Sequence, residues 1–236
     1  MIALLLAALL AGDVVVFAAA SLKESFEDLG VLFEKEHPGA KVRLDLAGSQ
    51  ELRTQLEHGA SADLFASADQ VQMDTLARQG LLLAPAIFAR NELMVIVPGN
   101  APPLALDDLP RARRIVLGDK AVPVGAYSDR LLAKRGAAFQ RSVEAQVVSR
   151  ELNVRQVLAK VALGEADAAI VYRTDALAAG SRVRATGIAA AENVLAAYPI
   201  AQLKAAPQPA LAAEFLRLVL SPRGRAVLSR RGFLPP

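Results

Sequence analysis

The sequence predicts an α/β protein of two lobes, each built on a mainly parallel sheet flanked by helices. Short apolar runs rich in β-branched residues, such as VVVF at 14–17, alternate with amphipathic stretches of helical period. Strands that alternate with helices need crossover connections, and these give parallel sheets. A chain of 236 residues is also long enough to bury a large core.

The first part of the chain contains three strand–helix units. The strands are expected at residues 14–17, 42–46 and 63–67. The helices that follow them end at three turn signals, which are His37-Pro38-Gly39, His58-Gly59 and Gln79-Gly80. The first of these helices begins at Ser21 and carries an apolar stripe that includes Phe26 and Phe33.

A second set of units follows a strand at 91–97 and a Pro/Gly-rich break. Its strands are expected at 114–117, 146–149 and 167–172, with helices after Gly125 and Asn153. One more strand lies near 197–200, and two helices end the chain, at Pro209–Leu220 and from Pro222 with Ser221 as its N-cap. Crossovers near 91–97 and 196–200 then divide the chain into lobe 1 (13–93 and 198–236) and lobe 2 (94–197).

Residues 2–11 form an unbroken apolar run, IALLLAALLA. A membrane span needs about 20 such residues, so this run is too short to cross a bilayer. Its length is typical of the apolar centre of a secretory signal, which predicts a signal segment at 1–12 and an exported protein without membrane insertion. The alternative is a buried N-terminal segment.

Composition excludes several classes of function. There are 27 Lys and Arg against 24 Asp and Glu, and aromatic residues make up only 5% of the chain. Nucleic-acid binding through a basic face with stacking aromatics is therefore not expected. The absence of Cys from the sequence excludes disulfides, thiolate metal sites and Cys nucleophiles.

The candidate functional groups lie where strands end and helices begin. Ligands of open α/β sheets bind beyond the carboxyl ends of the strands, here the loops 18–21, 47–50, 122–125 and 151–154 and the strand end at Tyr172. These loops carry few charges, but they offer backbone N–H groups at helix starts and the hydroxyls of Ser21, Ser49 and Tyr172. Such neutral donors suit a fully ionised oxyanion that carries no proton.

Each hydroxyl also has a purely structural interpretation. Ser21 with Glu24 three residues later matches a capping box, and Ser49 matches an ordinary N-cap. Tyr172 matches a core residue at the end of a strand. Only the coincidence of several such loops on one sheet edge favours a binding site.

Evidence for an enzyme is weak. The two histidines, His37 and His58, fall in the last turns of predicted helices, where a cation complements the helix dipole. Those positions are at the opposite sheet edge from Ser21 and Ser49, so a Ser–His pair is not expected. A Ser-dependent hydrolase would have to use Lys23 beside Ser21. We expect no catalytic residues, no cofactor and no metal ligands.

Several motifs carry a family resemblance. They are VFAAASL at 16–22, GASADLFASADQ at 59–70, VPVGAY at 122–127, NVR at 153–155, AIVYRTD at 169–175, YPI at 198–200 and SPRGRAVLSRRGF at 221–233. In this order they resemble the periplasmic molybdate-binding proteins of ABC importers, which are type II periplasmic binding proteins.

The resemblance implies a monomeric receptor that holds molybdate or tungstate between its lobes and delivers it to an inner-membrane ABC permease. The implied ligands are the hydroxyls of Ser21, Ser49 and Tyr172 and the backbone at Val124 and Val154. The main alternative is the same fold with another oxyanion, such as sulfate or phosphate.

Overall fold

The computed structural model describes residues 11–236. Residues 1–10 of the predicted signal segment, 1–12, lie outside the described part of the chain. Gly12 is already the first residue of a strand, where its N–H donates to the Gly39 carbonyl at 3.1 Å. In the described residues no helix combines the length and the apolar character that crossing a membrane requires.

The chain divides into two compact units. Unit 1 comprises Met1–Arg90 and Ala197–Pro236, and unit 2 comprises Asn91–Ala196. The sequence places these boundaries after residues 93 and 197, within a few residues of the divisions that the structure has.

Unit 1 is built on a five-stranded sheet of order β2-β1-β3-β10-β4. The strands are β1 (Gly12–Ala19), β2 (Ala40–Ala47), β3 (Leu64–Ala66), β4 (Ala86–Asn91) and β10 (Ala196–Gln202). β1 pairs in parallel with β2 and β3, whereas β10 runs antiparallel to β3. The sheet is therefore mixed: β1, β2 and β3 are parallel, as predicted, and β10, which returns from the other unit, runs in the opposite direction.

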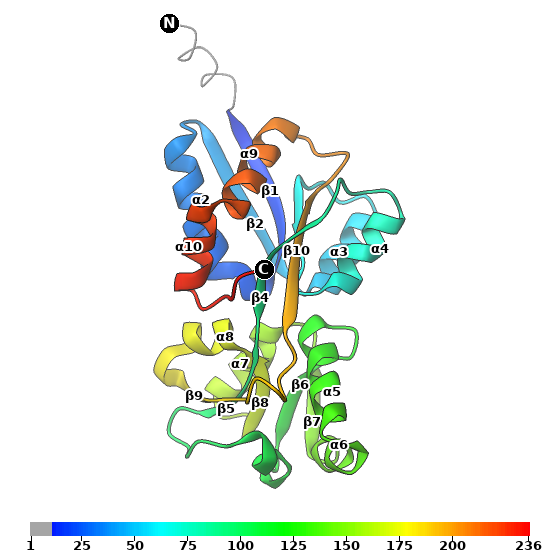
Figure 1. The fold of residues 1–236 in the computed structure, drawn as a ribbon, viewed down its shortest axis with the longest axis vertical. Coiled ribbons are helices and arrows are strands. Elements are labelled where there is room, and N and C mark those ends of the chain that lie inside the picture. Colours follow the sequence, from blue (N-terminus) through cyan, green and yellow to red (C-terminus); the bar gives the residue numbers. More distant parts are fainter. Residues whose placement is uncertain (1–10) are drawn as a thin grey trace, which may run out of the picture. The chain divides into compact units, whose positions relative to one another are not determined.

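Helices cover both faces of this sheet (Figure 1). On one face lie α2 (Lys23–Glu36), α9 (Pro209–Leu220) and α10 (Pro222–Arg230), and on the other lie α3 (Ser49–Glu57) and α4 (Gln70–Arg78). Phe26 and Phe33 of the predicted apolar stripe are fully buried and pack edge-on against Phe215 of α9. Ser221 caps α10 as predicted, since its hydroxyl accepts the Gly224 N–H at 3.0 Å.

Unit 2 has a sheet of order β7-β6-β8-β5-β9. Its strands are β5 (Leu93–Pro98), β6 (Ile115–Gly118), β7 (Val147–Glu151), β8 (Ala168–Tyr172) and β9 (Val183–Gly187). β6 pairs in parallel with β7 and β8, and β5 is antiparallel to both β8 and β9. This sheet is therefore also mixed, because β5 runs in the opposite direction to the two strands beside it.

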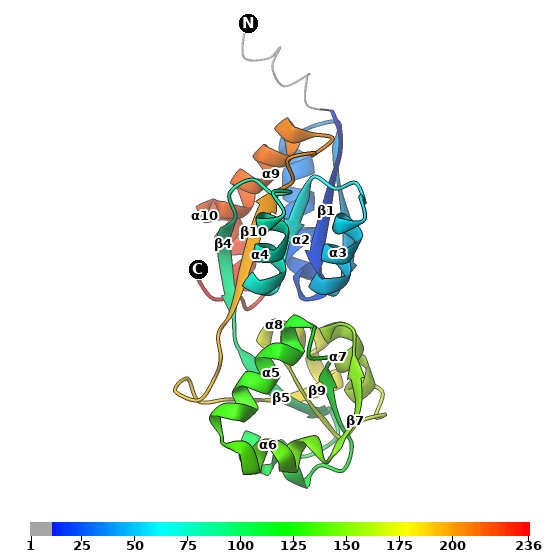
Figure 2. The same ribbon diagram turned by 90° about the vertical axis from the view of Figure 1, so that its right-hand side faces the viewer.

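The helices of unit 2 again lie on both faces of the sheet (Figure 2). They are α5 (Pro123–Lys134) and α6 (Ala137–Glu144) on one face, and α7 (Val154–Ala162) and α8 (Arg173–Ala179) on the other. Two 3-10 segments, η3 (Leu106–Arg111) and η4 (Gly180–Arg182), complete the unit.

Candidate functional site

Ser21 lies beyond the end of β1, in the 3-10 turn η2 (Ala20–Leu22) that leads into α2. The residue is 3% exposed, and its hydroxyl oxygen lies 2.9 Å from the hydroxyl oxygen of Tyr198. The capping box with Glu24 does not form, because Leu22 is the N-cap of α2 and no side chain caps this helix. The intervening 3-10 turn moves Ser21 out of the capping position, and its hydroxyl contacts β10 instead.

Ser49 is the first residue of α3 and is 1% exposed. The N-cap position belongs to Gly48, so the interpretation of Ser49 as an N-cap is wrong. Its hydroxyl oxygen accepts a hydrogen bond from the Ala68 N–H at 3.0 Å. The Gly48 N–H is satisfied separately by the Glu51 carboxylate at 2.8 Å. The Ser49 hydroxyl is thus fixed by the loop that follows β3.

The sheet register brings these two serines to the same edge of unit 1. Ala19 of β1 pairs with Ala47 of β2, and each serine follows two residues after its alanine. β10 also reaches this edge, because the Pro199 carbonyl accepts the Ser67 N–H at 2.9 Å. Two buried hydroxyls therefore lie at the carboxyl ends of neighbouring parallel strands, as the sequence predicts.

Val124 occupies the first turn of α5, one residue after Pro123, and is 1% exposed. N–H groups in a first helical turn have no partner within the helix. Two glycines allow this turn to sit directly on the end of β6. A Cβ on Gly125 would lie 2.0 Å from the Asp119 carbonyl oxygen, and one on Gly118 would lie 2.7 Å from the Val124 side chain. The backbone at Val124 is consequently held against the strand end.

Val154 is the first residue of α7, and Asn153 is its N-cap. The Asn153 side-chain oxygen accepts from the N–H groups of Arg155 at 3.0 Å and Gln156 at 3.1 Å. The cap therefore satisfies the second and third N–H groups of the helix. The Val154 N–H, at the first position, is not among the groups that this cap binds.

Tyr172 is the last residue of β8 and is 1% exposed, so it is buried at a strand end. Its ring packs edge-on against the Tyr127 ring, with centroids 6.3 Å apart. β6 lies between β7 and β8, and all three strands are parallel. Val124, Val154 and Tyr172 therefore share the carboxyl edge of these three strands in unit 2.

The charged groups near this edge are paired. Arg155 Nε lies 2.8 Å from the fully buried Asp175 carboxylate. Arg150 donates to the Gly118 carbonyl at 2.9 Å and lies 3.6 Å from Asp129. Burial raises the pKa of Asp129, while Arg150 acts in the opposite direction. The predicted binding residues themselves carry only neutral donors.

The geometry does not favour the Ser-dependent hydrolase. The hydroxyl of Ser21 contacts another hydroxyl, and Lys23 is exposed. His37 and His58 are the C-cap residues of α2 and α3, as predicted. Among residues 11–236 no group of three or more His, Asp or Glu side chains could hold a metal ion.

Tyr198 is the residue of this region that sequence reasoning missed. It carries the first position of the YPI motif, but nothing in that motif indicates that the hydroxyl reaches a residue 177 positions earlier in the chain. The pairing depends on β10 returning to the sheet of unit 1.

Comparison with known proteins shows close relatives of this chain. The molybdate-binding protein ModA of Mycobacterium tuberculosis H37Rv is 40% identical over 230 residues, covering 96% of this chain and 86% of its own length. ModA of Escherichia coli K12 is 33% identical, covering 94% of this chain and 89% of its own length. The resemblance indicated by the motifs is thereby confirmed.

Solved structures share the fold. The periplasmic molybdate-binding protein of Azotobacter vinelandii has a TM-score of 0.82 at 21% identity, covering 94% of this chain and 99% of its own. The sulfate-binding protein SubI of M. tuberculosis also has a TM-score of 0.82, at 15% identity, covering 94% of this chain and 86% of its own. The fold alone therefore does not distinguish between oxyanions.

A family model for bacterial extracellular solute-binding proteins matches residues 14–234. This family consists of binding proteins rather than enzymes, in agreement with the two edges of neutral donors. The chain belongs to the bacterial extracellular solute-binding protein family.

Proposed function

We propose that this protein is the substrate-binding component of an ABC importer and that it captures molybdate. In this proposal the anion-binding residues are Ser21 and Ser49 of unit 1 and Val124, Val154 and Tyr172 of unit 2. The three side chains act through their hydroxyls, and the two valines act through their backbone N–H groups.

The main support for the proposal is the burial and hydrogen bonding of the Ser21 and Ser49 hydroxyls. The hydroxyl oxygen of Ser49 already accepts the Ala68 N–H, and that of Ser21 lies at hydrogen-bond distance from a tyrosine hydroxyl. Each serine is 3% exposed or less, at an edge where helices begin. Buried hydroxyl groups need partners, and an anion supplies acceptors for their protons.

The chemistry of these donors favours an anion without a proton. Hydroxyl and N–H groups donate to an oxyanion, and a hydrogen bond to a charged group is stronger than one between neutral groups. A protonated phosphate would bring a further donor against this set of donors, which is unfavourable in a buried site. Molybdate and sulfate both satisfy this condition, so their discrimination depends on size.

The relatives favour molybdate over sulfate. The two ModA proteins cover most of this chain at 40% and 33% identity, whereas the sulfate-binding protein shares the fold at 15%. Tungstate has the same charge and nearly the same size as molybdate, so we expect it to bind as well. We also propose that the protein is a periplasmic monomer without a cofactor. It delivers its ligand to an inner-membrane permease.

The test is a thermal-shift panel with molybdate, tungstate, sulfate and phosphate. A ligand at about 1,000 times its dissociation constant stabilises the folded state by about 4 kcal/mol, which gives a clear rise in melting temperature. We expect this rise with molybdate and tungstate only. A rise with sulfate or phosphate instead would keep an oxyanion receptor and overturn the named ligand.

Tyr172→Phe and Tyr127→Phe form a matched pair for the residue assignment. Both substitutions remove one hydroxyl from a buried ring, and the two rings contact each other. We expect Tyr172→Phe to weaken molybdate binding well beyond Tyr127→Phe. Equal affinities in the two variants would remove Tyr172 from the site.

A further inference from the structure

The hydroxyl of Tyr198 contacts the hydroxyl of Ser21, which is one of the proposed binding residues. Tyr198 lies on β10 and is fully buried, and its hydroxyl oxygen is 2.9 Å from that of Ser21. Either oxygen can donate in this pair, but each hydroxyl has only one proton. If Ser21 donates its proton to an anion, the proton between the two residues must come from Tyr198.

Two aromatic rings hold the Tyr198 ring edge-on. The centroid of Phe233 lies 5.2 Å away at an interplanar angle of 79°, and that of Phe88 lies 6.3 Å away at 86°. Edge-to-face contacts of this kind fix ring orientation as well as burying apolar surface. The direction of the Tyr198 hydroxyl is therefore set by its packing.

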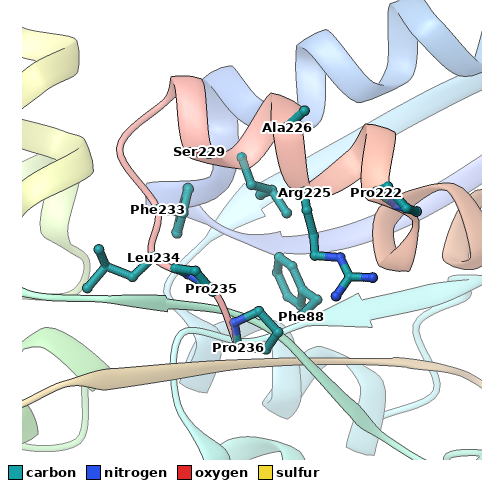
Figure 3. Close-up of a pocket in the computed structure, with 10 residues that line it drawn as sticks. Phe88, Pro222, Arg225, Ala226, Ser229, Phe233, Leu234, Pro235 and Pro236 are labelled. Atoms are coloured by element: carbon teal, nitrogen blue, oxygen red, sulfur yellow. The ribbon is translucent and has the colours of Figure 1, made fainter.

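The C-terminal segment keeps these rings in place. Phe88 and Phe233 line a cavity of about 280 Å³ between α10, β4 and the end of the chain (Figure 3). Leu234 exchanges two backbone hydrogen bonds with Arg90 of β4, both 2.9 Å long. The end of the chain is thus hydrogen-bonded to β4, beside the two phenylalanine rings against which Tyr198 packs.

The hydroxyl of Ser49 also has a hydrogen-bond partner, but here the partner is a backbone N–H. Its hydroxyl oxygen accepts the Ala68 N–H at 3.0 Å, which leaves the Ser49 proton for another acceptor. A backbone N–H directs Ser49, and a side-chain hydroxyl is placed to direct Ser21. Both serines would then present their protons to the same ligand before it arrives, so binding requires less reorganisation.

From this geometry we infer that Tyr198 is a positioning residue of the anion site: it donates to the Ser21 hydroxyl oxygen and directs the Ser21 proton toward the bound oxyanion. This inference rests on the proposed function of Ser21. Tyr198 itself does not touch the anion. Its effect on affinity must therefore pass through Ser21.

A double-mutant cycle tests this dependence. Molybdate affinity is measured by calorimetry for the wild-type chain, Ser21→Ala, Tyr198→Phe and the double variant. Loss of one hydrogen bond between neutral groups corresponds to about a fivefold change in affinity. We expect Tyr198→Phe to weaken binding by about fivefold in the wild-type background and to have no effect in the Ser21→Ala background.

Ser25→Ala is the matched control, because Ser25 is also buried but its hydroxyl donates to the Leu22 carbonyl three residues earlier. We expect this variant to bind molybdate as the wild type does. A melting temperature of apo Tyr198→Phe close to that of the apo wild type shows that the ring still packs.

Two results would overturn the inference and leave the proposed function standing. One is full molybdate affinity in Tyr198→Phe while Ser21→Ala is weakened. The other is an equal loss from Tyr198→Phe in both backgrounds, which would mean a general structural effect. A wild-type chain that binds none of molybdate, tungstate, sulfate and phosphate would overturn both.

Discussion

Ser21 and Ser49 lie at equivalent places in unit 1, yet neither hydroxyl is used to cap its helix. Capping is the commonest use of a serine at a helix start. Here one helix begins with an uncapped 3-10 turn and the other uses Gly48 as its N-cap. The Ser21 hydroxyl contacts that of Tyr198 instead, and the Ser49 hydroxyl accepts the Ala68 N–H.

Ser49→Ala is expected to weaken molybdate binding. A lost hydrogen bond to a charged group corresponds to roughly 1.5–3 kcal/mol, or about a 10- to 150-fold rise in the dissociation constant. Calorimetric titration beside Ser25→Ala measures the difference between a binding hydroxyl and a structural one. Identical dissociation constants for the two variants would show that Ser49 does not contact the anion.

Asp63→Ala is expected to destabilise unit 1 without any direct effect on the site. The Asp63 carboxylate is fully buried and accepts the Val15 N–H at 2.8 Å and the Gln208 N–H at 2.7 Å. Removing it leaves two donors without their acceptor, so the free energy of unfolding should fall by about 3 kcal/mol or more. Urea denaturation measures this fall, with the exposed Asp45→Ala on β2 as the control. A similar small change in both variants would contradict the assigned role.

The loops that hold the candidate residues could be predicted from sequence because strand ends and helix starts have local signals, whereas Val124 and Val154 were singled out only by the family resemblance. The pairing of Tyr198 with Ser21 could not be predicted, since it depends on packing between distant segments. The interpretation of Ser21 and Ser49 as helix caps was wrong for a related reason. Local patterns identify a helix start to within a residue or two, whereas capping depends on the exact position.

At the scale of elements, the contact of α5 with β6 is set by two glycines. A Cβ on Gly125 would lie 2.0 Å from the Asp119 carbonyl oxygen and 2.5 Å from that of Gly118. Both contacts involve backbone atoms, which cannot move away as a flexible side chain could. The first turn of α5, with the Val124 N–H, therefore depends on glycine at this position.

Gly125→Ala is expected to push α5 away from β6, with a loss of stability of about 1–3 kcal/mol or more, typical of overpacking. Molybdate affinity should fall as well, because the Val124 N–H moves with the helix. Gly187→Ala is the matched control, since a Cβ there meets no atom within 4 Å and the backbone is not left-handed. Thermal melting and calorimetry of both variants measure the two effects. An unchanged Gly125→Ala protein would contradict the close contact.

Helices α2 and α10 are joined by ion pairs. Arg231 makes hydrogen bonds of 2.7 and 2.8 Å to the two carboxylate oxygens of Asp28, and Arg223 pairs with Glu36. The hydrogen bond from Arg231 lowers the pKa of Asp28 below its ordinary value. A carboxyl with a lowered pKa stabilises the folded state above its unfolded pKa, and this stabilisation is lost as the pH falls through the folded value.

Asp28→Asn should therefore lower the free energy of unfolding at pH 7 by up to about 1 kcal/mol, because the pair is partly exposed. The difference from the wild type should shrink as the pH falls below about 4. Urea denaturation at pH 7, 5 and 3 measures this trend. A difference that widens on acidification would contradict the assigned ion pair.

Element predictions succeeded where a strand or helix has its own start and stop signals. α9 has the predicted bounds, Pro209–Leu220. The strand β4 was missed because only Glu92 separates it from β5, and the helix α8 was missed because it follows β8 directly. α6 and β9 are short elements, of eight and five residues, and they too were missed.

At the scale of the whole molecule, the α/β class and two-unit organisation follow from the alternation of strands and helices. Strand direction does not follow from that alternation. β10 returns to the sheet of unit 1 antiparallel to β3, and β5 is antiparallel to β8, so both sheets are mixed. Parallel pairing is predicted by crossover helices, whereas β5 and β10 are reached without such a crossover.

The proposed function requires that Ser21 and Tyr172 both contribute to molybdate binding. Calorimetric titration of molybdate into the wild-type chain, Ser21→Ala and Tyr172→Phe tests it most directly. We expect one molybdate per wild-type chain and a roughly 10-fold or larger rise in the dissociation constant in each variant. Two sites per chain, or a loss in Ser21→Ala beside an unchanged Tyr172→Phe, would contradict it.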